Sequence, residues 1–74
     1  MLFEKGNDFV EITQALSADT NDTVWYVYTN LDLENLPAEL RVKVSETDQE
    51  GLDKLKKALE SWADNEGFKL VLKI

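Results

Sequence analysis

The fold is decided by residues 47–67, which read TDQEGLDKLKKALESWADNEG. Apolar side chains recur there at steps of three and four residues, the spacing that gathers them on one face of an α-helix. Thr47 and Glu50 have the spacing of a capping box, in which each side chain accepts a hydrogen bond from the backbone amide of the other. Gly67 suits the left-handed residue that ends many helices. The stretch therefore predicts one amphipathic helix at about 48–65. Its apolar stripe consists of Leu52, Leu55, Leu59 and Trp62.

Alternating segments on both sides of this helix predict strands. Residues 40–45 and 68–74 alternate apolar with mostly polar side chains, the period-two pattern of a half-buried strand. A strand, a helix and a strand in this order form a βαβ unit whose two strands run parallel. The helix stripe is expected to cover the apolar face of that unit, made of Leu40, Val42, Val44, Phe68, Leu70 and Leu72.

The N-terminal half predicts an antiparallel hairpin. Residues 24–28, Val-Trp-Tyr-Val-Tyr, are strongly β-prone, and a second strand runs through Val10 to Leu16. The polar segment Asp19–Asp22 has hairpin-loop length and would pair Ala18 with Thr23. A short strand at 2–4 and a turn at 6–8 precede the hairpin.

This register gives the hairpin two faces. Because strand side chains alternate, a one-residue slip in pairing would exchange the two faces. The expected core face holds Val10, Ile12, Leu16, Trp25, Val27 and Leu31. The expected outer face holds Phe9, Glu11, Thr13, Val24, Tyr26, Tyr28, Asn30 and Asp32.

Together these elements predict a single α+β domain spanning residues 1–74. Its sheet is expected to be mixed but mainly antiparallel, with four or five strands, one helix on one face and a C-terminal βαβ unit. The absence of Cys suits a reducing compartment. No apolar stretch approaches the ~20 residues of a membrane span, and no signal peptide is visible. We therefore expect a cytoplasmic protein that does not contact membranes.

The inventory of reactive side chains argues against catalysis. The chain has no His and no Cys, so the commonest general base, the thiol nucleophile and the nitrogen and sulfur metal ligands are missing. The segment beginning at Asp19 resembles a calcium loop only faintly. Its sixth position would be Val24 instead of Gly, and its twelfth Asn30 instead of Glu. We expect no enzyme activity, no cofactor and no metal site.

The net charge of −7 is confined to the first forty residues. From residue 41 onward acidic and basic side chains balance. A negative field limited to half of a small domain repels nucleic acid and attracts basic surfaces. The acids of the first half are Glu4, Asp8, Glu11, Asp19, Asp22, Asp32, Glu34 and Glu39, against the single cation Lys5.

A binding surface is expected where this charge meets the two tyrosines of the outer face. Tyrosine is enriched at the centres of protein interfaces, where it supplies rigid area and a polar group. The plainer alternative is that the tyrosines cover cross-strand neighbours and that the acids serve solubility. The predicted partner-binding residues are Glu11, Asp19, Asp22, Tyr26, Tyr28, Asp32 and Glu34.

Two functional hypotheses follow. In the first, the chain is a non-catalytic inhibitor or adaptor that docks its acidic half on a basic partner, such as a nucleic-acid-binding enzyme. In general character it resembles small acidic proteins of phages and mobile elements, including antagonists of restriction or CRISPR systems. Its acids lie mostly in turns, which favours a general docking surface over a regular nucleic-acid mimic. In the second hypothesis, two copies associate through the outer sheet face as a homodimer.

Overall fold

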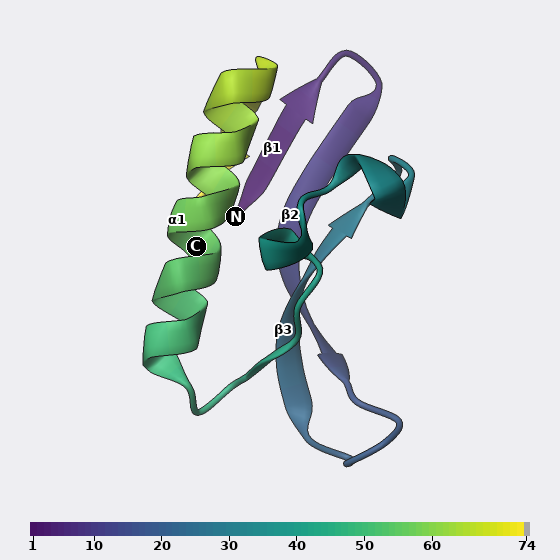
Figure 1. Ribbon diagram of the computed structural model, residues 1–74, viewed down its shortest axis with the longest axis vertical. Helices are drawn as coiled ribbons and strands as arrows, with labels where there is room; N and C mark the ends of the chain where they lie inside the picture. Colours follow the sequence, from purple (N-terminus) through teal and green to yellow (C-terminus); the bar gives the residue numbers. More distant parts are fainter. Residues whose placement is uncertain (74) are drawn as a thin grey trace.

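The computed structural model describes residues 1–73 and shows one sheet with one long helix against it (Figure 1). This confirms the predicted α+β class. In chain order the elements are β1 (Leu2–Lys5), β2 (Asp8–Leu16), β3 (Thr23–Thr29), the 3₁₀ turns η1 (Leu33–Asn35) and η2 (Ala38–Leu40), β4 (Val44–Ser45), α1 (Gln49–Glu66) and β5 (Lys69–Leu72).

The five strands lie in the order β4-β3-β2-β1-β5, and each neighbouring pair is antiparallel. The helix joins β4 to β5, which occupy opposite edges of the sheet. These two strands run in the same direction, as expected for strands that flank a crossover helix, but three strands separate them. Within residues 1–73 no parallel ladder forms, so the described sheet is antiparallel instead of mixed. The physical reason is that β4 and β5 each extend a different edge of the β1-β2-β3 meander.

Strand β4 is much shorter than the predicted strand at 40–45. It contains only Val44 and Ser45, which pair with Trp25 and Val24. Leu40 instead ends η2, which contacts α1, and its side chain is 1% exposed. Because Leu40 is buried from a 3₁₀ turn, the residues just before Val44 do not continue the strand.

Helix α1 starts and ends one residue later than predicted. Asp48 caps its N-terminus, because its carboxylate accepts a hydrogen bond of 2.9 Å from the amide of Gly51. The Thr47 hydroxyl lies 3.0 Å from that of Ser45, so the predicted capping box between Thr47 and Glu50 does not form. Aspartate is at least as good an N-cap as threonine, and its use moves the start by one residue.

The C-terminus of α1 follows the prediction for Gly67, which takes a left-handed conformation with φ 80°. The amide of Gly67 donates to the carbonyl of Asp64 at 3.3 Å, and that of Phe68 donates to Ala63 at 2.8 Å. This is the Schellman arrangement, which usually brings an apolar contact with it. Here the rings of Trp62 and Phe68 lie 5.3 Å apart and close the helix end.

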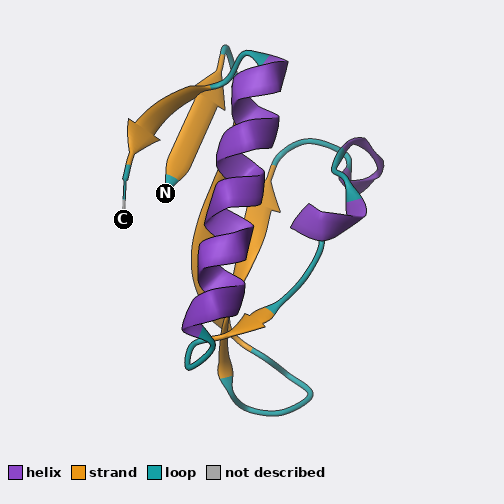
Figure 2. Ribbon diagram, turned by 60° about the vertical axis from the view of Figure 1, so that its left-hand side comes forward, coloured by secondary structure: helices purple, strands orange, loops and turns teal. Residues whose placement is uncertain are grey.

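The core lies between α1 and one face of the sheet, and the η1–η2 connection lies beside the helix (Figure 2). Its buried side chains are Met1, Phe3, Val10, Ile12, Val27, Leu36, Leu40, Val44, Leu52, Leu55, Leu59 and Ala63. Trp25, Leu31, Trp62 and Phe68 pack against this core but are only partly buried.

Three leucines expected in the core lie outside it. Leu16 is 66% exposed because it ends β2 beside the hairpin loop. Leu70 and Leu72 are 50% and 62% exposed, because the helix does not cover the edge strand β5. In the edge strand β5, alternation of apolar and polar residues therefore does not indicate that the apolar side chains are buried.

The β2–β3 hairpin keeps its predicted faces although its register differs. Leu16 pairs with Thr23, where Ala18 was expected to do so. The amide of Ser17 donates to Asp22, and the amide of Asn21, which has φ 61°, donates to Ser17, both at 2.8 Å. These bonds close the loop two residues earlier on the β2 side. A shift of two residues moves no side chain to the other face.

Candidate protein-binding surface

Strands β2 and β3 present one face to the core and a second face away from the helix. Val10, Ile12 and Val27 lie on the first face, under α1. Within residues 1–73, no helix packs against the second face (Figures 1 and 2). We call this second surface the aromatic face; its central side chains are Phe9, Glu11, Thr13, Tyr26 and Tyr28.

Three aromatic rings form a connected cluster on the aromatic face. The ring centroids of Phe9 and Tyr28 lie 5.6 Å apart, and those of Tyr26 and Tyr28 lie 6.5 Å apart with their planes at 74°. Both separations fall in the range where aromatic pairs attract each other. Tyr28 is nevertheless 51% exposed, so much of this residue remains accessible to another molecule.

Glu11 is the acidic side chain that the fold brings into this cluster. It pairs directly with Tyr28 across the ladder, while Thr13 pairs with Tyr26. Burial lowers the pKa of the Met1 amino group, and the Glu11 carboxylate acts in the opposite direction. The charge of Glu11 therefore acts toward the N-terminus, at the start of β1.

The end of β3 is fixed by side chains that bind backbone atoms. The Thr29 hydroxyl donates to the carbonyl of Phe9 at 2.6 Å and accepts from the amide of Leu31 at 3.1 Å. The side chain of Asn30 accepts from the amide of Phe9 and donates to the carbonyl of Asn7, both at 2.9 Å. These bonds hold the backbone of Phe9 against β3 and so position its ring beside Tyr28.

The other predicted acids lie apart from the cluster. Asp19 and Asp22 are exposed on the loop between β2 and β3. Asp32 lies at the N-cap of η1, and Glu34 lies within η1. Both follow the end of β3, in the connection that turns toward the helix. The structure thus groups Glu11, Tyr26 and Tyr28, but places the remaining four acids on two flanking segments.

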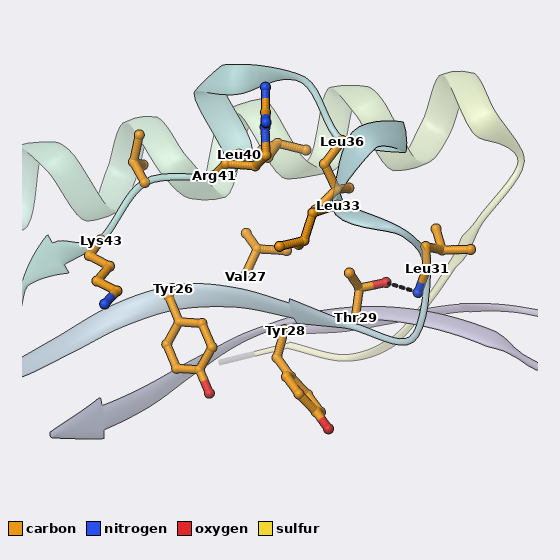
Figure 3. Close-up of a pocket in the computed structure, with 11 residues that line it drawn as sticks. Tyr26, Val27, Tyr28, Thr29, Leu31, Leu33, Leu36, Leu40, Arg41 and Lys43 are labelled. Carbon is orange, nitrogen blue, oxygen red and sulfur yellow. Dashed lines mark hydrogen bonds between the residues drawn. The ribbon is translucent and has the colours of Figure 1, made fainter. Parts of the chain in front are cut away.

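A groove of about 400 Å³ separates the end of β3 from the η1–η2 connection (Figure 3). The backbone from Tyr26 to Thr29 forms one wall, and the connection forms the other. Its lining is mainly apolar, with Arg41 and Lys43 as the charged members. The apolar side chains contributed by the connection are Leu31, Leu33, Leu36, Leu40 and Val42.

Sequence reasoning did not identify the groove, nor the roles of Thr29 and Asn30. The available signal was a pair of short polar residues directly after the β-prone run, a composition that often marks side-chain bonds to the backbone. The groove depends on Leu40 leaving the strand pattern, which alternation alone does not reveal.

The remaining findings concern other kinds of site. Among residues 1–73, no group of three or more acidic, His or Cys side chains is placed to hold a metal ion. No helix in this part of the chain is long and apolar enough to cross a membrane. Comparison with protein-family models, curated proteins and solved structures gives no match.

Proposed function

We propose that this chain is a non-catalytic protein-binding module that docks its aromatic face on a basic surface of a partner protein. The observation that carries the proposal is the cluster of Phe9, Tyr26 and Tyr28 on a sheet face without a helix, with Glu11 beside Tyr28. Tyrosine is enriched at the central contacts of an interface, and charged side chains such as that of Glu11 lie mostly at its polar rim.

Charge and shape have different roles in this proposal. The acids of residues 1–40 attract a cationic partner from a distance and repel nucleic acid, which speeds the correct encounter. The tyrosines then lose their remaining water and slow dissociation, because affinity within one interface is controlled mostly by the off-rate. The acids on the flanking loop and on η1 contribute to the field without touching the aromatic cluster.

The class of partner follows from this chemistry. Grooves that hold nucleic acid are strongly cationic, because they neutralise the phosphate backbone. The chain would therefore act as an inhibitor or adaptor of a nucleic-acid-binding enzyme in the cytoplasm, in the manner of phage or mobile-element antagonists of restriction or CRISPR systems. Because the carboxylates lie on a strand, a loop and a 3₁₀ turn, the proposed surface is a general acidic one and does not copy a regular row of phosphates.

Affinity capture with matched variants tests the proposal. The immobilised chain is exposed to a host lysate, and retained proteins are eluted with a salt gradient. Glu11→Lys and Glu60→Lys change the net charge equally, but Glu60 lies on the helix, in the other layer. We expect Glu11→Lys and Tyr28→Ala to lose a basic protein that wild type and Glu60→Lys retain. Equal retention by all four proteins would show that the aromatic face is not the site.

A second candidate function is self-association, favoured by a different surface. Edge strand β5 exposes half or more of each of Leu70, Val71 and Leu72. A homodimer that covers the sheet face and this edge would bury them in an isologous contact. Mass measurement separates the candidates, since a monomer supports partner binding and a dimer supports self-association.

A further inference from the structure

Beyond Trp25, the side of β3 that faces the groove has no neighbouring strand within residues 1–73, and Val27 on that side is 7% exposed. Strand β4 pairs with Val24 and Trp25, and the groove lies beside the later residues of β3. Alternate residues of an antiparallel strand direct both backbone groups toward the same neighbour. The carbonyl of Thr23 accepts from Glu46, on the β4 side, at 3.2 Å. By this alternation, Val27 and Thr29 also direct their backbone groups to the β4 side, where the groove lies.

Within the described residues, the backbone of the connection does not pair with this edge. Continuing the register of β4 would place Val42 opposite Val27 and Leu40 opposite Thr29. Leu40 is instead buried in the core from η2, and the backbone at Val42 diverges from β3. In the part of the chain that the structure describes, no backbone hydrogen bond joins residues 27–29 to residues 40–43. The groove of about 400 Å³ lies between β3 and this connection.

The walls of this groove indicate the side chains that a segment bound there would carry. Leucines and Val42 line it, which favours apolar side chains in the occupant. The charged lining residues, Arg41 and Lys43, are both cationic, in a chain of net charge −7. Lys43 extends toward Tyr26 at the mouth of the groove, while Arg41 points away from β3 (Figure 3). A carboxylate near Lys43 would find a complementary charge.

We propose that the groove binds an extended, acidic and apolar segment of a partner protein, which adds as a short strand to the edge of β3. Val27 and Thr29 would supply the backbone hydrogen bonds, the apolar walls would take alternate side chains, and Lys43 would face an Asp or Glu. Two bonding residues separated by about 7 Å fit a segment of three to five residues. This site does not rest on the proposed function, because it uses the edge of β3 and not its aromatic face.

A second copy of the chain fits this groove less well. The exposed edge strand that a copy would offer is β5, and Lys69 and Lys73 flank its apolar residues. Those lysines would approach Lys43, and like charges placed opposite each other in a sheet are destabilising. The charge of the groove thus favours an acidic segment from a different protein.

Nuclear magnetic resonance can test the proposal with a defined probe. The ¹⁵N-labelled chain is titrated with the peptide acetyl-Ser-Val-Asp-Val-Ser-amide, and the control peptide carries Lys in place of Asp. We expect saturable shifts of the Val27 and Thr29 amides and slower hydrogen exchange at both. The Lys peptide and the variant Lys43→Glu should each bind about fivefold more weakly, whereas Lys69→Glu, the matched control, should bind like wild type.

Further variants test the apolar wall and separate this site from the aromatic face. Leu33 and Leu16 are similarly exposed, at 61% and 66%, but only Leu33 lines the groove. Leu33→Ser should therefore weaken peptide binding, while Leu16→Ser and Glu11→Lys should leave it unchanged. The proposal is overturned if no amide shifts saturate, or if the two leucine variants behave alike. It is also overturned if Val27 and Thr29 exchange as slowly in the free chain as Tyr26 and Tyr28, because residues 41–43 then close the edge.

Discussion

The two faces of the β2–β3 hairpin use the same strands for different purposes. On one face Val10, Ile12 and Val27 are buried under the helix, and on the other Glu11 and Tyr28 lie beside each other without such cover. A domain of 74 residues builds little more than one apolar layer, so its stability depends on the first face. The aromatic face adds large apolar groups that this layer does not use, and this marks it as a candidate interface.

The largest expected effect is a loss of stability from the buried face. Leu55 is 2% exposed on the inner side of α1. Leu55→Ala removes buried methyl groups and leaves a cavity, which should lower the free energy of unfolding by about 2–5 kcal/mol. Thermal or urea denaturation followed by circular dichroism measures this change. For so small a domain the loss is enough to unfold much of the population at 25 °C.

Tyr28→Ala is the matched test on the other face. It should reduce the free energy of binding to the partner by about 2 kcal/mol, mainly through a faster off-rate, if the ring is an anchor. Its effect on the free energy of unfolding should stay below about 1 kcal/mol, because the residue is already 51% exposed. Surface plasmon resonance and denaturation report the two quantities. If Leu55→Ala and Tyr28→Ala were equally destabilising, the aromatic face would contribute to stability as much as the buried face does, and the proposed division of roles would be wrong.

A smaller loss of stability is expected at Thr29, whose side chain binds backbone atoms at the end of β3. Thr29→Val keeps the shape of the side chain but removes the donor to the carbonyl of Phe9 and the acceptor for the amide of Leu31. Leaving these partly buried backbone groups without partners should lower the free energy of unfolding by about 1–2 kcal/mol. Chemical denaturation measures it, with Thr13→Val as the control on a neighbouring position of the aromatic face. If both variants were as stable as wild type, the Thr29 hydroxyl would not fix the end of β3.

The sequence predicts the buried face better than the edges, for a physical reason. Helix periodicity located α1 within one residue at each end, and the faces of the hairpin were right because a register shift of two preserves side-chain parity. The prediction that β4 and β5 belong to a mixed sheet was wrong, because alternation does not show which edge of the sheet a strand joins.

The site was predictable only in part. The tyrosines and Glu11 follow from strand alternation, which placed them on one face. Asp32 was expected on that face too, but β3 ends at Thr29 and the chain then turns into η1. Bonds between side chains and the backbone set that end point, and the lack of a neighbouring strand at Val27 within residues 1–73 follows from the burial of Leu40 in η2. Contacts of this kind depend on the tertiary structure and produce no periodic pattern in the sequence.

The smallest expected effect lies at the corner where the buried face meets the start of α1. Alanine normally stabilises a helix interior over glycine by about 1 kcal/mol. At Gly51, however, an added Cβ would lie 2.9 Å from Cγ of Asp48 and 3.0 Å from a methyl group of Val44. It would displace the carboxylate that caps the helix, at a cost of about 1 kcal/mol, and press on a buried side chain. The two effects oppose each other, so Gly51→Ala should leave the free energy of unfolding unchanged or lower it by up to about 1 kcal/mol.

A double-mutant cycle isolates the reason for that result. In the Asp48→Ala background the cap is already lost and only the contact with Val44 opposes helix propensity, so Gly51→Ala should be more favourable there than in the wild type by about 1 kcal/mol. Urea denaturation of the wild type, both single variants and the double variant gives the coupling between the two positions. A gain of the same size in both backgrounds would mean that neither the Asp48 cap nor the contact with Val44 limits this corner. The packing around residue 51 would then accommodate an extra methyl group without loss of stability.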